Sequence, residues 1–148
     1  MTAKDDLKYM RRALALAAAQ DGRTGGNPSV GCVLISKLGH RLSEGATSDD
    51  GRPHAEELAL RSLGGRAPGA PAYVTLEPCR ERSTGTVSCS QMLIDADVAR
   101  VVCAIADEHP NGAGGLDRLR AAGIDVEVGL MADDAQALYA DFFSRSNY

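Results

Sequence analysis

Apolar residues near the start of the chain recur at the spacing of an amphipathic helix. The positions that share one helical face are Leu7, Met10, Leu14 and Ala17. Gly22, followed by a short segment of glycines and Pro28, interrupts the pattern. The pattern predicts a helix over about residues 4–20 that packs on a core, followed by a loop.

Short apolar runs separated by turn residues predict five strands, and four later segments predict helices. The expected strands are 30–35, 41–45, 72–76, 101–105 and 124–128, and the expected helices are 53–63, 89–97, 116–122 and 132–145. Ser88 is a suitable N-cap for the helix that begins at residue 89. Single helices between strands favour right-handed crossovers, so we expect an α/β fold with a largely parallel sheet, an initial antiparallel hairpin and helices on both faces.

Composition narrows the class of protein. At 148 residues, 44% of them hydrophobic, the chain can bury one core, so we expect a single domain over residues 1–148. The 16 basic and 20 acidic residues give a formal net charge of −4, which argues against nucleic acid as a partner. No apolar run approaches the ~20 residues of a membrane span. This composition favours a small molecule as the partner.

Cysteine usage and the N-terminal residues bear on the cellular compartment. Four cysteines in a chain of this size, two of them inside apolar runs, favour free thiols in a reducing compartment, the cytoplasm. The apolar run 13–19 has the length of a signal-peptide core, but Asp5 and Asp6 occupy the region that should be basic. We therefore interpret this run as part of the packed helix.

Three short segments carry residues suited to chemistry, and each lies where a loop meets a helix or strand end. They are Pro53-His54-Ala55-Glu56, Glu77-Pro78-Cys79 and Cys89. Histidine and cysteine are preferred zinc ligands, and a catalytic zinc keeps three protein ligands and one open position. His54, Cys79 and Cys89 therefore form a candidate Zn²⁺ site, with Glu56 as the candidate catalytic acid and base. The helix N-terminus at Cys89 is expected to lower the pKa of its thiol.

Three alternatives remain open from the residues alone. A disulfide between Cys79 and Cys89 would close the intervening loop. A closed structural zinc would need a fourth ligand, for which the sequence offers Cys32, Cys103, His40 and His109. The third alternative is a catalytically silent zinc protein that serves in assembly.

Three motifs resemble the cytidine-deaminase-like superfamily: Asn27-Pro28-Ser29-Val30-Gly31-Cys32-Val33, Pro53-His54-Ala55-Glu56 and Thr75-Leu76-Glu77-Pro78-Cys79. Two further segments, 98–102 and 121–131, are similar to the pyrimidine deaminase domain of bifunctional riboflavin-biosynthesis deaminase/reductases. The likeness covers about residues 7–143. The printed chain ends at Tyr148 without the reductase domain of that family, so we expect a stand-alone deaminase domain.

The resemblance implies a three-layer α/β/α sandwich with a five-stranded mixed sheet, and a homo-oligomer. The zinc ligands that it implies are His54, Cys79 and Cys89. It makes Glu56 the proton shuttle and assigns substrate contacts to Asn27 and Ala55. The implied activity is hydrolytic deamination of an amino-substituted nitrogen heterocycle (a pyrimidine, purine or pterin-type base, nucleoside or nucleotide). The riboflavin-pathway diaminohydroxyphosphoribosylaminopyrimidine is the alternative substrate.

The loop from Arg80 to Ser88 departs from the riboflavin branch. It has nine residues where that branch has eight, and it lacks the histidines and the Gly-Arg/Lys-Thr-Pro-Pro stretch of that branch. Ala46-Thr47 likewise stands where the branch has a histidine after the second strand. Arg80 and Arg82 are candidate substrate-binding residues, because a guanidinium can hold an anionic group with two parallel bonds. The alternative is a solvated loop paired with Glu81, and the lost histidines favour an uncharged ring as substrate.

Overall fold

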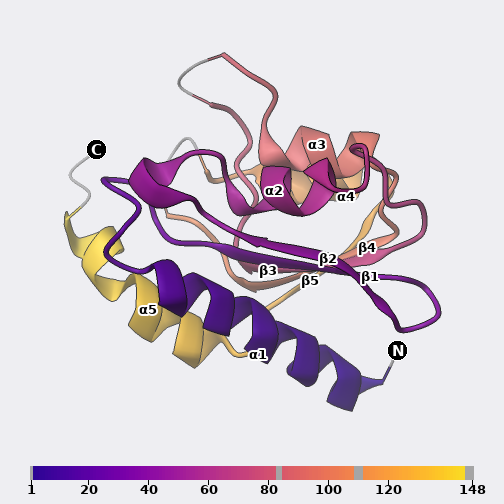
Figure 1. Cartoon of the computed structure of the whole chain (residues 1–148), viewed down its shortest axis with the longest axis horizontal. Helices are drawn as coiled ribbons and strands as arrows, with labels where there is room; N and C mark the ends of the chain where they lie inside the picture. Colours follow the sequence, from indigo (N-terminus) through magenta and orange to yellow (C-terminus); the bar gives the residue numbers. More distant parts are fainter. Residues whose placement is uncertain (1, 83–84, 109–111, 146–148) are drawn as a thin grey trace.

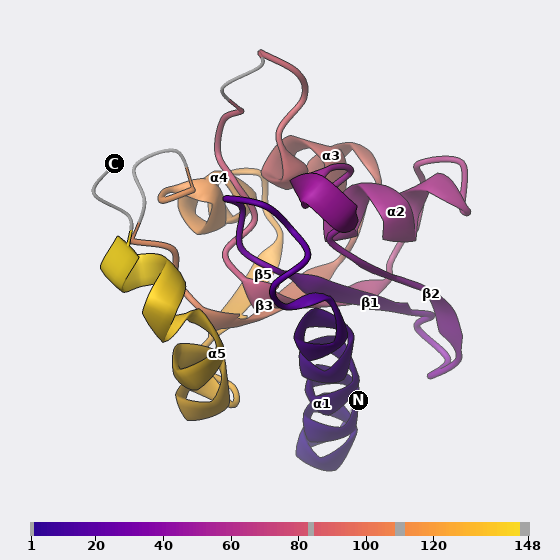
Figure 2. The ribbon, with the colours of Figure 1, turned by 60° about the vertical axis from the view of Figure 1, so that its left-hand side comes forward.

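A five-stranded mixed sheet forms the middle layer of the structure, a computed structural model that describes residues 2–82, 85–108 and 112–145. The strands lie in the order β2-β1-β3-β4-β5, with bounds β1 (Gly31–Ile35), β2 (Arg41–Ala46), β3 (Pro71–Leu76), β4 (Arg100–Ile105) and β5 (Asp125–Val128). The helices are α1 (Ala3–Gln20), α2 (Ala55–Arg61), α3 (Cys89–Asp95), α4 (Gly115–Ala121) and α5 (Ala132–Arg145), with a 3₁₀ turn at Asp49–Gly51. In Figures 1 and 2, α2, α3 and α4 cover one face of the sheet, and α1 and α5 cover the other. The expected three-layer α/β sandwich is confirmed.

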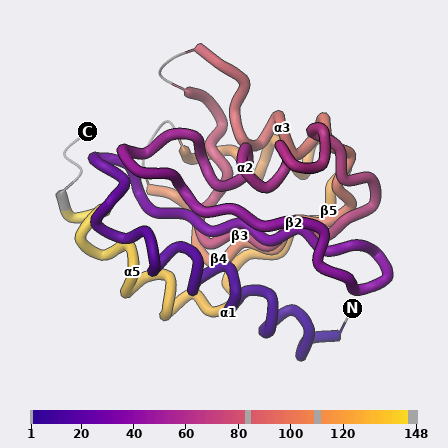
Figure 3. The backbone as a smooth tube through the Cα atoms, in the orientation of Figure 1, coloured from indigo at the N-terminus to yellow at the C-terminus, as the bar shows by residue number. Residues whose placement is uncertain are grey.

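The expectation of a largely parallel sheet is only half right. β3, β4 and β5 are parallel neighbours, but β1 pairs antiparallel with β3 as well as with β2. The crossover from β2 through α2 to β3 does connect parallel strands, as helical connections do, but it passes over β1, which lies between them (Figure 3). A helix between two strands indicates their relative direction, but it does not indicate whether they are neighbours.

The element boundaries lie within two residues of those predicted. The largest differences are at α2, which begins at Ala55 instead of 53 and ends at Arg61 instead of 63, and at α3, which ends two residues early. The predicted cap is confirmed, because the Ser88 side chain accepts a hydrogen bond from the backbone N–H of Gln91 at 3.1 Å. Within the described residues, no helix is long and apolar enough to cross a membrane.

Two apolar clusters hold the layers together, one on each face of the sheet. On β1, alternate residues divide between them: Cys32 and Leu34 pack under α2 and α3, whereas Val33 and Ile35 pack against α1 and α5. Such alternation follows from the strand period of two, and covering both faces makes every residue of β1 buried. The strands therefore read as continuous apolar runs in the sequence.

Asp6 ties α1 to the sheet through a largely buried charge network. Arg100 of β4 donates to both carboxylate oxygens of Asp6, at 3.0 and 2.9 Å, and the Tyr73 hydroxyl donates to one of them. These hydrogen bonds, that of Arg100 first, lower the pKa of the Asp6 carboxyl despite its burial. Asp6, one of the two acidic residues that argued against a signal peptide, therefore holds α1 against the sheet.

Replacing Asp6 with asparagine is expected to lower the free energy of unfolding by about 2 kcal/mol at pH 7, because the partly buried Arg100 guanidinium loses its charged hydrogen bonds to Asp6 and keeps only its ion pair with Glu127. Because folding lowers the pKa of Asp6, the stabilisation is complete above the unfolded-state value near 4 and disappears as pH falls through the lower folded-state value. The difference between the two proteins should therefore shrink below about pH 4. Urea unfolding at pH 7 and pH 3 measures it, and an equal difference at both pH values would contradict the assignment.

Candidate active site

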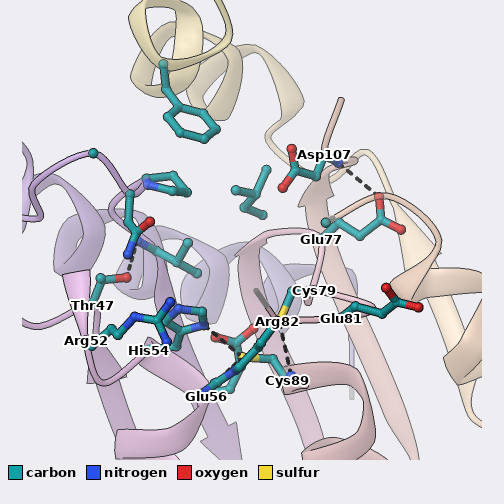
Figure 4. Close-up of a pocket in the computed structure, with 17 residues that line it drawn as sticks. Thr47, Arg52, His54, Glu56, Glu77, Cys79, Glu81, Arg82, Cys89 and Asp107 are labelled. Atoms are coloured by element: carbon teal, nitrogen blue, oxygen red, sulfur yellow. Dashed lines mark hydrogen bonds between the residues drawn. The ribbon is translucent and has the colours of Figure 1, made fainter. Parts of the chain in front are cut away.

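A pocket of about 260 Å³ opens at the edge of the sheet where β3 and β4 end and β1 begins (Figure 4). Its size lies near the lower end for small-molecule sites. Ligand sites of open α/β sheets lie beyond the carboxyl ends of the strands, and the N-termini of α2 and α3 meet the pocket there. The side chains with candidate chemistry that line it are Asn27, Thr47, Arg52, His54, Glu56, Glu77, Cys79, Glu81, Arg82, Cys89 and Asp107.

The three predicted metal ligands converge at this pocket. His54 is the N-cap of α2, Cys89 is the first residue of α3, and Cys79 lies in the loop after β3. His54 Nδ1 is 3.4 Å from Cys89 Sγ, and one donor atom from each of the three residues lies within 4.8 Å of the others. Tetrahedral zinc at usual bond lengths separates nitrogen and sulfur donors by roughly 3.5 Å and two sulfurs by roughly 3.8 Å. The donor set therefore fits a zinc ion in chemistry and in spacing.

The structure bears on two of the alternatives to a catalytic zinc site, the disulfide and the closed structural zinc. All four cysteines have free thiols, so the Cys79–Cys89 disulfide is absent. Among residues 2–82, 85–108 and 112–145, the group suited to a metal contains no fourth histidine, cysteine or carboxylate. Cys32 and Cys103 are buried within β1 and β4, and His109 lies outside the described residues. A set of three protein donors leaves one coordination position for a water or a substrate.

The position of Cys79 depends on its neighbour Glu77. The Glu77 carboxylate accepts backbone N–H groups from Asp107, Gly114 and Leu116 at 3.0–3.1 Å, which holds the loop after β3 against the start of α4. A Cβ atom at Gly115 would lie 1.7 Å from the Pro78 carbonyl oxygen, so glycine is required at this close approach. Glu77 was part of the recognised motif, but the sequence does not indicate that it receives three hydrogen bonds.

Glu56 lies in the first turn of α2, two residues after His54, and is only 3% exposed. Burial first, and then the Cys79 thiolate, raise the pKa of its carboxyl to about 7, although the nearby His54 opposes the change. Figure 4 shows its carboxylate beside His54 and the two cysteines. A buried carboxyl group beside the donor set is placed to exchange protons with a molecule in the pocket.

Cys79, and not Cys89, is the thiol with the lowered pKa. The backbone N–H of Cys89 donates to Cys79 Sγ at 3.2 Å. The pKa of Cys79 is well below its ordinary value, mainly because the Cys89 side chain donates a hydrogen bond to its thiolate. The same interaction, together with burial, raises the pKa of Cys89, so the prediction of a lowered value there is wrong.

The predicted substrate-binding residues are not all brought together. Asn27 lines the pocket, and its Nδ2 donates to the Gly51 carbonyl oxygen at 3.1 Å. Ala55, the first residue of α2, is fully buried in the core and does not line the pocket. Arg80 also lies outside the lining, half exposed and 3.8 Å from Glu81, as the solvated-loop alternative expected. Arg82 lines the pocket, but its guanidinium is 2.6 Å from Glu57 and bonds Cys89 Sγ at 3.3 Å.

Three pocket residues were not singled out from the sequence for a role in the site. Thr47 is buried, and its hydroxyl accepts the Val30 N–H at 2.9 Å, which extends the β1–β2 pairing into the pocket. Arg52 lies beside the candidate metal ligand His54, and Phe142 reaches the pocket from α5. No local pattern marks them, because the pocket draws on segments that are far apart in the chain.

The mixed sheet, the His-Cys-Cys donor set and the buried glutamate together define the class of zinc-dependent deaminases. The sequence profile described as "Cytidine and deoxycytidylate deaminase zinc-binding region" matches residues 3–105. The chain belongs to this zinc-binding deaminase family.

Individual relatives extend the likeness beyond the zinc-binding region. Riboflavin biosynthesis protein RibD of Escherichia coli K12 is 49% identical over 141 residues, which are 95% of this chain but 38% of that protein. The diaminohydroxyphosphoribosylamino-pyrimidine deaminase of Buchnera aphidicola is 36% identical over 95% of both chains. The structure of Acinetobacter baumannii RibD superposes with a TM-score of 0.87 at 42% identity and covers 95% of this chain and 40% of that one. The chain thus spans about two fifths of the RibD proteins and nearly all of the shorter relative.

Proposed function

We propose that this protein hydrolyses the exocyclic amino group of a nitrogen heterocycle. One observation carries the proposal: the Glu56 carboxyl is buried beside three donors suited to zinc, in a pocket that a single ring system could enter. Water adds to the ring carbon that bears the amine, a C–O bond forms, the C–N bond breaks, and ammonia leaves. The product carries an oxo group in place of the amine.

His54, Cys79 and Cys89 would hold the zinc ion, which when bound supplies a Lewis acid that makes water acidic enough to act as a nucleophile. Glu56 takes the proton from the attacking water and returns protons to the ring nitrogen and to the departing amine. Asn27 is placed to hold the ring, because its bond to Gly51 fixes the orientation of its amide at the pocket wall. Gly51 adopts φ +97°, and a Cβ there would lie 2.3 Å from Asn27 Nδ2, so glycine permits this contact.

Release of ammonia tests the reaction class. The zinc-loaded protein should release ammonia from at least one compound in a panel of aminopyrimidines, aminopurines and aminopterins. The absence of ammonia with every compound, from protein that holds one zinc per chain, would favour the catalytically silent zinc protein instead.

A second, narrower candidate is the riboflavin-pathway diaminohydroxyphosphoribosylaminopyrimidine. It is favoured by the Buchnera relative, whose name contains this substrate and which matches 95% of this chain. A phosphorylated substrate needs a cation at the pocket, and the exposed Arg52 lines it beside His54, whereas Arg80 does not. We therefore assign the phosphate contact to Arg52 in this candidate.

If a phosphorylated aminopyrimidine is the substrate, Arg52→Ala should raise its KM by roughly 10-fold or more, the size of one lost charged hydrogen bond. The KM of the dephosphorylated compound should change little, and Arg80→Ala should leave both values within about twofold. Steady-state kinetics with the two compounds measures this. If the unmodified protein uses the dephosphorylated compound better, the substrate carries an uncharged ring instead of a phosphorylated one.

We also propose a homo-oligomer that works in the cytoplasm. The family resemblance supports the oligomer, and four free thiols in one chain suit a reducing compartment. Analytical ultracentrifugation of the zinc-loaded protein tests the assembly, and a monomer at micromolar concentration would contradict it.

A further inference from the structure

Arg82 places a buried guanidinium between the two helices that carry metal ligands. Its side chain is only 6% exposed, its Nη2 is 2.6 Å from Glu57 Oε1, and the same nitrogen donates to Cys89 Sγ at 3.3 Å. Arg80, two residues earlier, has a side chain that is 50% exposed. The two arginines of this loop therefore occupy different environments, although the sequence gives them the same candidate role.

Glu57 extends the contact of Arg82 to a second ligand. Glu57 Oε1, the atom bonded by Arg82, also accepts the backbone N–H of His54 at 3.2 Å. A continuous path of hydrogen bonds thus runs from His54 through Glu57 and Arg82 to Cys89. It joins the first turn of α2 to the first residue of α3, so Arg82 contacts one ligand directly and the other through Glu57.

The charges of the site explain why an arginine is held there. Two thiolates neutralise a divalent cation, and the Glu57 carboxylate beside them adds a negative charge that Arg82 balances. Burying a guanidinium is costly unless its donors are used, and Nη2 of Arg82 contacts both a carboxylate and a sulfur. Among the described residues, no acceptor lies within hydrogen-bond distance of the buried Nε of Arg82, so the contacts of Nη2 must help to offset the cost of burying this side chain.

We infer that Arg82 is a positioning residue of the metal centre: it holds the Cys89 thiolate toward the ion and ties it to His54 through Glu57. The inference rests on the proposed metal site. It gives the rewritten loop a role in metal retention instead of substrate binding. Partners that hydrogen-bond a metal ligand in this way typically contribute 10–100-fold to metal affinity.

Zinc affinity tests this role in the full-length protein. Zn²⁺ dissociation constants are measured by competition with a chromophoric chelator for the unmodified protein, Arg82→Gln and Arg82→Met, with Arg80→Ala as the matched control. Arg82→Gln should bind Zn²⁺ about 10–100-fold more weakly, and Arg80→Ala should bind it as the unmodified protein does. Arg82→Met, similar in length and without a donor, replaces the first variant if that one does not fold.

Cobalt spectra separate positioning of the thiolate from general stabilisation. A hydrogen bond lowers the energy of the sulfur electrons, so its loss should move the sulfur-to-cobalt charge-transfer band of the Co²⁺-loaded Arg82 variants to longer wavelength. A merely structural role would lower the melting temperature without moving the band. If the Arg82 variants keep both the Zn²⁺ affinity and the charge-transfer band of the unmodified protein, the inference is overturned. A raised KM for substrate with unchanged Zn²⁺ affinity would also overturn it. Failure of the unmodified protein to bind Zn²⁺ would overturn the proposed metal site as well.

Discussion

Replacing Glu56 with glutamine is expected to lower kcat by 10²-fold or more while zinc stays bound. The amide keeps the shape of the side chain but cannot accept a proton from water and pass it to the leaving amine. Positioned acid or base groups contribute 10²–10⁴-fold to rate, and in the proposed mechanism Glu56 serves both proton transfers. Because Glu56 is 3% exposed, bulk water has poor access to replace it.

The measurement combines ammonia release at saturating substrate with metal analysis of the same sample. Glu127→Gln is the matched control, because this carboxylate lies exposed on the edge strand β5, away from the pocket. It should leave kcat within about twofold. If Glu56→Gln loses its zinc together with its activity, the carboxylate is a ligand and the proposed roles are wrong.

Replacing Cys89 with serine is expected to remove most of the zinc and, with it, part of the stability. A serine hydroxyl stays protonated at neutral pH and is a poor substitute for a thiolate, and the Arg82 contact loses its sulfur acceptor. Because zinc binds the folded protein, its binding free energy adds to the free energy of unfolding. Added zinc should therefore raise the melting temperature of the unmodified protein but not that of the variant.

Cys103→Ser provides the control for Cys89→Ser. Cys103 is also fully buried, but it lies in β4 and its thiol bonds the Ile105 carbonyl, which a hydroxyl can also do. The control should keep about one zinc per chain, and Cys89→Ser should keep well under half of that after dialysis against a weak chelator. Full zinc occupancy in Cys89→Ser would exclude Cys89 as a ligand.

Local patterns in the chain were sufficient for the elements and for the three candidate metal ligands, which the structure brings together. Apolar periodicity and turn residues predicted each helix and strand to within two residues, because these signals act over a few positions. The donors were identifiable because histidine and cysteine next to helix starts have few other uses in such a pattern. Ser88 was assigned as a cap for the same kind of local reason.

The sequence pattern could not distinguish residues whose roles depend on distant partners. Arg80 and Arg82 look equivalent in the loop, yet only Arg82 reaches Glu57 and Cys89. Glu77 receives its three hydrogen bonds from residues at least 30 positions away. Such contacts depend on how the loops pack over the sheet, which short-range periodicity does not encode.

Strand order and thiol chemistry were likewise decided by the tertiary structure. β1 lies between β2 and β3, and this insertion turned one expected parallel pairing into an antiparallel one. The helix N-terminus was expected to act on Cys89, but the folded loop brings Cys79 against the Cys89 side chain and N–H, and the hydrogen bond from that side chain is the main reason that the pKa of Cys79 falls. Chain order and residue type thus determined which strands and reactive side chains are available. Long-range packing determined which strands are neighbours and which side chains form hydrogen bonds or ion pairs.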